Sequence, residues 1–176
     1  LLPLLAKPLS RSQLVFGKFL GCWIACGLTL LCFYVFLGVL AGCRDHHWPV
    51  LDYFQAATLH WFVLGIVVAM SLLGSLVFAA PSSNSTICFV VVAGILLLGR
   101  HLDQVALQLS EPMRGITLAI YYVIPHLEFF DMRDLVIHDW PLIAWKFYGL
   151  AILYALAYIG VFLAGACLAF RRKAVN

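Results

Sequence analysis

Long apolar runs alternate with short polar segments along the chain. Residues 19–43, 53–99 and 147–170 contain no charged side chain. About 20 apolar residues wound as an α-helix cross the hydrocarbon core of a bilayer. The middle run is about twice that length, and the Pro-, Ser- and Asn-rich residues 81–86 favour a turn within it. The pattern therefore predicts four transmembrane helices, at about residues 19–43, 56–80, 85–109 and 147–170.

The segment between the last two predicted spans is different. Residues 110–146 form a predicted external loop, and within it residues 116–124 are apolar but too few to cross a membrane. Pro125 closes this short run, so a re-entrant or interfacial helix is expected there. On the preceding span, Arg100 and Asp103 lie three residues apart and begin a polar stripe on one helix face.

Composition agrees with this pattern. Of 176 residues, 64% are hydrophobic and 11% are charged, which is more apolar surface than a water-soluble domain of this size could bury. We therefore predict an all-α polytopic membrane protein with a single transmembrane domain, residues 1–176, embedded in a lipid bilayer. The net charge of +3 comes with no basic patch interleaved with aromatic residues, so no nucleic acid partner is expected.

Charge asymmetry predicts the orientation. One side of the predicted membrane collects only bases: Lys7, Arg11, Lys18, Arg171, Arg172 and Lys173. The other side holds every acid: Asp45, Asp52, Asp103, Glu111, Glu128, Asp131, Asp134 and Asp139. By the positive-inside rule, both ends of this chain are cytoplasmic and the acidic loops are external. We expect the membrane to be a bacterial plasma (inner) membrane.

The segment before the first span has its own pattern. Residues 1–18 are predicted to form a cytoplasmic elbow, in which Pro8 fixes a turn and Ser10 or Ser12 caps the following helix. Two pairs of glycines four residues apart favour close helix packing: Gly17 with Gly21, and Gly38 with Gly42.

This segment resembles a motif of ABC-2 type permeases, the membrane subunits of one class of ABC transporter. The matching residues are Leu4, Leu5, Lys7, Pro8, Leu9, Ser10, Arg11, Leu14, Gly17 and Lys18. A second run, residues 124–133, is similar to a loop of permeases related to multicopper-enzyme and nitrous-oxide-reductase maturation. The resemblance implies spans three to six of a six-span plan, and the first residue is not Met, so we expect a part of a larger polypeptide.

The resemblance also implies how such a subunit works. The chain has no phosphate-binding G-x-x-x-x-G-K-[ST] loop, so we expect no enzyme activity and no cofactor of its own, with ATP bound by a separate ATPase subunit. The expected assembly holds two permease copies and two ATPases. The residues expected to couple to the ATPase are Lys7, Pro8, Ser10, Arg11, Gly17 and Lys18. Those expected to form an external gate are Arg100, Asp103, Pro125, His126, Glu128 and Asp131.

Three other interpretations of the same residues were weighed. The histidines could bind copper, but no two of them have the i, i+4 spacing of ligands on a helix, so we predict no metal site. The histidines are His46, His47, His60, His101, His126 and His138. An intramembrane enzyme would need a nucleophile and a base, for which the candidates are Thr29, His60, Ser71 and Ser75. A structural anchor subunit would explain the spans but not the motif before them.

Overall fold

The computed structural model describes residues 10–45, 48, 50–78, 80–132 and 142–172, and the side chains of residues 11, 45, 98–107, 120, 123 and 172 lie outside this description. The described residues form five α-helices and one short 3-10 helix, with no strand among them. The helices are α1 (Arg11–Asp45), α2 (Val50–Val77), α3 (Pro81–Gln108), α4 (Met113–Val123), η2 (Leu127–Phe130) and α6 (Trp145–Arg172).

Three of these helices, α1, α2 and α6, are long and apolar enough to cross a membrane. At about 1.5 Å per residue, the 35 residues of α1 extend about 50 Å, well beyond a hydrocarbon core of about 30 Å. In α3 the described apolar part is shorter, Pro81–Leu97. The predicted all-α polytopic class is confirmed. The four spans overlap α1, α2, α3 and α6, and their membrane boundaries stay predictions.

The predicted turn at residues 81–86 is wrong, because these residues form the first turns of α3. Pro81 occupies the first helical position, where the missing N–H would have had no partner in the helix. The hydroxyls of Ser85 and Thr86 donate to the carbonyls of Pro81 and Ser82, one turn back. The helix therefore starts four residues before the predicted third span.

Helix α1 starts at one of the two expected capping residues. Ser10 Oγ accepts a hydrogen bond of 3.4 Å from the backbone N–H of Gln13, and Gln13 Oε1 accepts one of 2.9 Å from the N–H of Ser10. This reciprocal pair is a capping box, which satisfies two backbone donors at a helix start. Residues 11–18 of the predicted elbow and the first span therefore form one continuous helix, and residues 1–9 lie outside the described structure.

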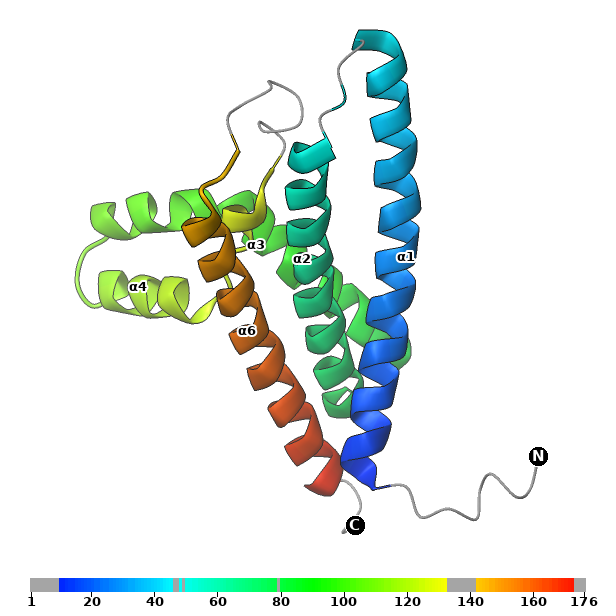
Figure 1. Cartoon of the computed structure of the whole chain (residues 1–176). Helices are drawn as coiled ribbons and strands as arrows, with labels where there is room; N and C mark the ends of the chain where they lie inside the picture. Colours follow the sequence, from blue (N-terminus) through cyan, green and yellow to red (C-terminus); the bar gives the residue numbers. More distant parts are fainter. Residues whose placement is uncertain (1–9, 46–47, 49, 79, 133–141, 173–176) are drawn as a thin grey trace, which may run out of the picture.

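The helices form a bundle with two distinct ends (Figure 1). We call the end where α1 begins and α6 finishes the N/C end, and the opposite end, where α1 finishes and α6 begins, the loop end. Helix α2 runs back to the N/C end, so the chain must cross the bundle again before α6 begins. It does so through α3, whose second half lies across the bundle beside α4.

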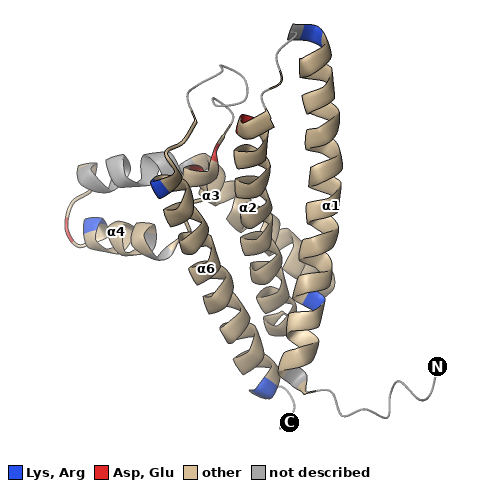
Figure 2. Cartoon of the chain, viewed as in Figure 1, with Lys and Arg blue, Asp and Glu red and all other residues tan. Residues whose placement is uncertain are grey.

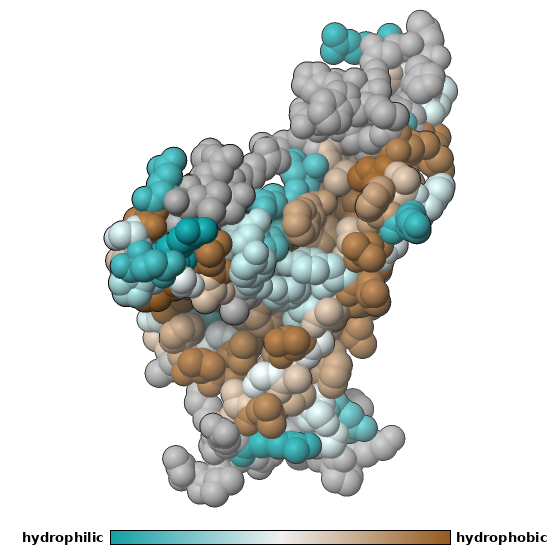
Figure 3. Space-filling model, turned by 90° about the vertical axis from the view of Figure 1, so that its left-hand side faces the viewer, coloured by the Kyte–Doolittle hydropathy of each residue, from teal (hydrophilic) through white to brown (hydrophobic). Residues whose placement is uncertain are grey.

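Charge and hydropathy change along the bundle, from the N/C end to the loop end. In the part of the chain that is described, acidic residues colour only the loop end and the α3–α4 arm, whereas the N/C end carries basic ones (Figure 2). On the face turned toward α4, apolar side chains occupy a belt between polar surfaces above and below it (Figure 3). Such a belt is the surface expected of a protein that spans a bilayer.

Two tryptophans join α1 to α2 near the middle of the bundle. Trp23 Nε1 donates to the carbonyl of Trp61 at 2.9 Å, and Trp61 Nε1 donates to the carbonyl of Trp23 at 3.0 Å. The two indoles stack with ring centroids 4.5 Å apart. Each indole lies over the glycine four residues beyond the other tryptophan, Gly65 and Gly27 respectively. We call this reciprocal arrangement the tryptophan pair.

Candidate functional site

The candidate site is built on residues 124–132, which fold into the loop end of the bundle. Pro125, Leu127, Phe130 and Met132 are buried there, and η2 packs against α2 and α3. Phe130 is only 1% exposed, so this loop segment is part of the core. Burial of the alternate apolar side chains fixes the directions in which the polar side chains between them point.

His126 is held from three sides. Its backbone N–H donates to the hydroxyl of Tyr154 on α6 at 2.8 Å. Its ring contacts Tyr121 and Phe129, with centroids 4.4 and 5.3 Å away. Its Nδ1 lies 3.6 Å from Oε1 of Glu128. The expected gate residues Pro125, His126 and Glu128 are therefore brought together with Tyr154, a residue that the sequence did not indicate.

The two carboxylate oxygens of Glu128 differ: Oε1 lies near His126, and Oε2 has no hydrogen-bond partner in the described structure. Its side chain is 17% exposed, and its Oε2 is buried with no hydrogen-bond partner in the described structure. A buried carboxylate oxygen without a donor is costly, because the free energy of hydration is lost without replacement. Charged residues at membrane depth face protein interiors or cavities and mark binding or transport pathways.

A cavity of about 510 Å³ adjoins Glu128. It lies between α2, α3 and η2, and its described lining is His60, Val63, Leu96, Leu97, Leu127, Glu128, Phe130 and Asp131. His60 also accepts or donates a hydrogen bond with the hydroxyl of Tyr34 on α1. The site therefore combines polar groups from α2 and η2 with apolar walls from three elements.

Of the other expected gate residues, Asp131 lines this cavity, whereas the side chains of Arg100 and Asp103 lie outside the described residues. Both belong to α3, the helix that supplies Leu96 and Leu97 to the cavity wall. Their role in a gate stays a prediction.

At the N/C end, Ser10, Gly17 and Lys18 are exposed, and Lys7, Pro8 and the side chain of Arg11 lie outside the described residues. A Cβ atom at Gly17 or Gly21 would meet no described atom of this chain within 4 Å. At Gly38 it would just reach Tyr53 at 4.0 Å, and at Gly42 it would clash with Trp48 at 2.7 Å. A role of Gly17 and Gly21 in packing against another helix stays a prediction.

Sequence reasoning missed Gln55, which anchors the chain just before α6. Gln55 is fully buried, and its side-chain amide makes two hydrogen bonds with Ile143, 88 residues away. Nε2 donates to the carbonyl at 3.1 Å and Oε1 accepts from the N–H at 3.2 Å. The available signal was an uncharged polar residue in the charge-free run 53–99, directly before the predicted second span, because polar side chains in such runs bond to other segments.

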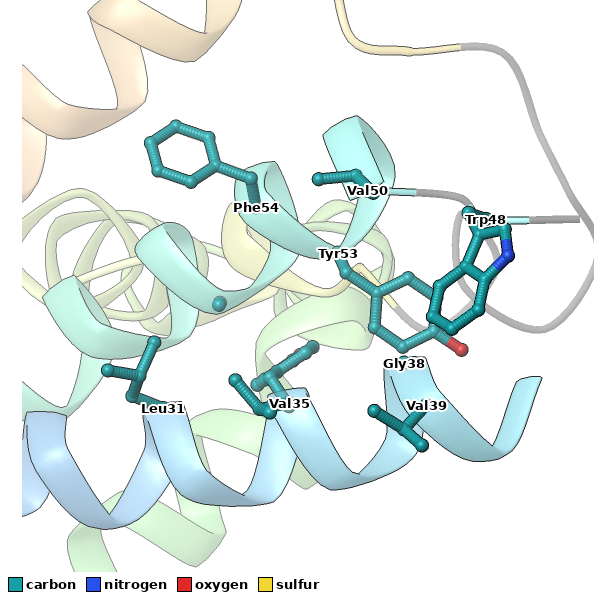
Figure 4. A pocket seen from close by; sticks show the side chains of 10 residues that line it. Leu31, Val35, Gly38, Val39, Trp48, Val50, Tyr53 and Phe54 are labelled. Atoms are coloured by element: carbon teal, nitrogen blue, oxygen red, sulfur yellow. The ribbon is translucent and has the colours of Figure 1, made fainter. Parts of the chain in front are cut away.

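A second hollow lies between α1 and α2 near the loop end. It measures about 310 Å³, and Figure 4 shows Leu31, Val35, Val39, Val50 and Phe54 around it, with Trp48 and Tyr53 at one end. Its described walls are almost wholly apolar, with no charged side chain among the residues known to line it. The cavity beside Glu128 is therefore the better candidate for a site that selects by charge.

Two of the three hydroxyls named for an intramembrane enzyme, those of Thr29 and Ser75, donate to carbonyls of their own helices. Thr29 donates to the carbonyl of Ala25, and Ser75 donates to that of Leu72. The carbonyl of Ser71 accepts from the side chain of Asn84, which ties α2 to α3. Among the described residues, no three His, Cys, Asp or Glu side chains gather closely enough to hold a metal ion.

The sequence matches the family described as ABC-2 family transporter protein, over residues 1–175. The chain belongs to this family. The permease resemblance read from residues 4–18 is therefore confirmed at the level of the family, and the chain is a membrane component of an ABC transporter. No curated protein and no solved structure matches it significantly. The closer likeness to maturation permeases stays a prediction.

Proposed function

We propose that this ABC-2 family chain is the permease subunit of a transporter driven by ATP hydrolysis on a separate subunit. It moves a substrate, or transmits mechanical work, across a bacterial inner membrane. The observation that carries the proposal is the family match over residues 1–175, together with the absence of a phosphate-binding loop from the sequence.

The N/C end is the face that the ATPase contacts. Support comes from the basic residues at this end, since positive flanks favour the cytoplasm. Lys18 of α1 and Arg171 of α6 are both exposed at this end. Because α1 is continuous from its capping box, a push on residues 7–18 is transmitted along a rigid helix toward the tryptophan pair.

Two copies of the permease form the transport pathway between them. Support comes from α1, on which Leu20, Ile24 and Leu28 each expose about half of the side chain to the outside of this chain. Gly17 and Gly21 would let another helix approach closely on α1. Occupation of this surface by a second copy gives a homodimer with two ATPases.

The double variant Lys7→Glu and Arg11→Glu is expected to uncouple the ATPase. Reversing two charges at the contact replaces attraction with repulsion and leaves the spans unchanged. With full-length permease and ATPase reconstituted in liposomes, the permease-dependent part of ATP hydrolysis should fall by about tenfold. The measurement is phosphate release with and without the permease.

The matched control reverses two bases near the loop end, Arg114→Glu and Lys146→Glu, both of which are exposed. This pair should leave permease-dependent hydrolysis unchanged. Equal hydrolysis in the two double variants would remove the coupling assignment. If the permease is instead a structural anchor, no ATPase co-purifies with it and hydrolysis does not depend on its presence.

A further inference from the structure

The cavity beside Glu128 has a chemical character that a transport pathway alone does not require. Its described walls are apolar residues from α2, α3 and η2: Val63, Leu96, Leu97, Leu127 and Phe130. Two acidic residues, Glu128 and Asp131, and His60 complete the described lining, which contains no lysine or arginine. A volume of about 510 Å³ lies within the usual range for sites that hold drug-sized molecules.

The carboxylate of Glu128 indicates which kind of molecule the cavity binds. Oε1 of Glu128 faces His126, but Oε2 is buried and has no donor in the described structure. Buried apolar side chains and the bond from His126 to Tyr154 fix the backbone of residues 125–132, which places Glu128 beside the cavity. A ligand with positive charge beside Oε2 offsets the negative charge of this carboxylate.

We propose that this cavity binds a lipophilic organic cation, with the charge at Glu128 and the apolar body against Val63, Leu97 and Phe130. A small hydrated metal ion does not fit this surface, because most of the wall offers no oxygen or nitrogen ligand. An anionic amphiphile would be repelled by the acidic side chains of Glu128 and Asp131, and a neutral one would leave the buried charge of Glu128 uncompensated. The proposal rests on the proposed function, since it names the substrate class of that permease.

The test measures binding of tetraphenylphosphonium to the full-length permease with its ATPase, in nanodiscs. Tetraphenylborate, which has nearly the same size and the opposite charge, is the matched ligand. The variants are Glu128→Gln, which keeps the side-chain shape and removes the charge, and Val63→Phe, which fills the cavity from α2. Glu111→Gln, at an exposed acid in the turn between α3 and α4, is the matched control.

We expect the unaltered permease to bind tetraphenylphosphonium and not tetraphenylborate. Both Glu128→Gln and Val63→Phe should weaken tetraphenylphosphonium binding by about tenfold or more, with no change in Glu111→Gln. Binding of both ions alike, or undiminished binding of the cation to Glu128→Gln, overturns the proposal.

ATP hydrolysis separates this proposal from the one on which it rests. If hydrolysis depends on the permease but the cation does not bind, the substrate class is wrong and the ATP-driven permease stands. If no ATPase assembles with the permease, the proposed function itself fails, whatever the binding of the cation.

Discussion

Gly65→Leu is expected to separate α1 from α2 and to lower the stability of the bundle strongly. A Cβ at Gly65 would lie 2.8 Å from Nε1 of Trp23 and 2.9 Å from Cδ1 of Ile159. The indole of Trp23 cannot move aside freely, because its Nε1 donates to the carbonyl of Trp61. The side chain therefore meets a fixed ring on α1 and another side chain on α6.

Two costs add at this position. Overpacking a filled interior costs about 1–3 kcal/mol, and loss of an interhelical hydrogen bond in a membrane costs about 0.6–2 kcal/mol. We expect the free energy of unfolding to fall by about 3 kcal/mol. The measurement is unfolding of the purified permease in mixed micelles by a denaturing detergent, followed by the fluorescence of the tryptophans.

The control is Gly160→Leu on α6, where a Cβ would meet no described atom within 4 Å. It adds the same side chain to an exposed position of a spanning helix and should leave the unfolding curve unchanged. Gly27→Leu should reproduce the effect of Gly65→Leu, since a Cβ there would lie 2.5 Å from Nε1 of Trp61. Equal stability of Gly65→Leu and Gly160→Leu would show that the tryptophan pair does not hold α1 against α2.

The helices themselves could be predicted because their signal is local. A run of apolar residues without charge, such as residues 147–170 within α6, indicates a spanning helix whatever its neighbours are. Boundaries were less certain, since Pro81 and the serines after it serve a turn and a helix start equally well. The short helix at Met113–Val123 was indicated by its length and by Pro125.

The contacts between helices could not be predicted in the same way. The tryptophan pair joins residues 38 positions apart through hydrogen bonds to backbone carbonyls. Every residue has a backbone carbonyl, so the sequence does not indicate which ones accept these bonds. The glycines beneath the two indoles, Gly27 and Gly65, are not part of a four-residue glycine pair. Their role depends on which indole the opposite helix presents, which only the packed structure specifies.

The candidate site was predictable in part. Residues 125–131 stood out because residues 124–133 resemble a loop of maturation permeases, and this resemblance implied an external gate there. The cavity could not be anticipated, since its walls include Val63, Leu96 and Leu97, ordinary apolar residues of two spanning helices. Nothing in the sequence distinguishes these three from the residues that face lipid.

Gln55→Leu is expected to release the chain that leads into α6. Leucine fills nearly the same space but offers no polar group, so the N–H and carbonyl of Ile143 lose both of their partners at once. Leaving a buried backbone group unpaired costs about 1–3 kcal/mol, so we expect a loss of about 2–4 kcal/mol in local stability for the pair. Exchange of the Ile143 amide hydrogen with deuterium should accelerate by at least about tenfold.

Two further variants separate this explanation from a general disturbance of α2. Gln55→Glu keeps an acceptor for the N–H of Ile143 and loses the donor to its carbonyl, so amide exchange at Ile143 should lie between the values for glutamine and leucine. Gln108→Leu makes the same change at an exposed glutamine, the last residue of α3, and should leave exchange at Ile143 unaltered. If Gln55→Leu leaves this exchange as slow as in the unaltered permease, Gln55 does not anchor the start of α6. The segment with Glu128 would then be held by the buried side chains of Leu127 and Phe130 and by the bond from His126 to Tyr154.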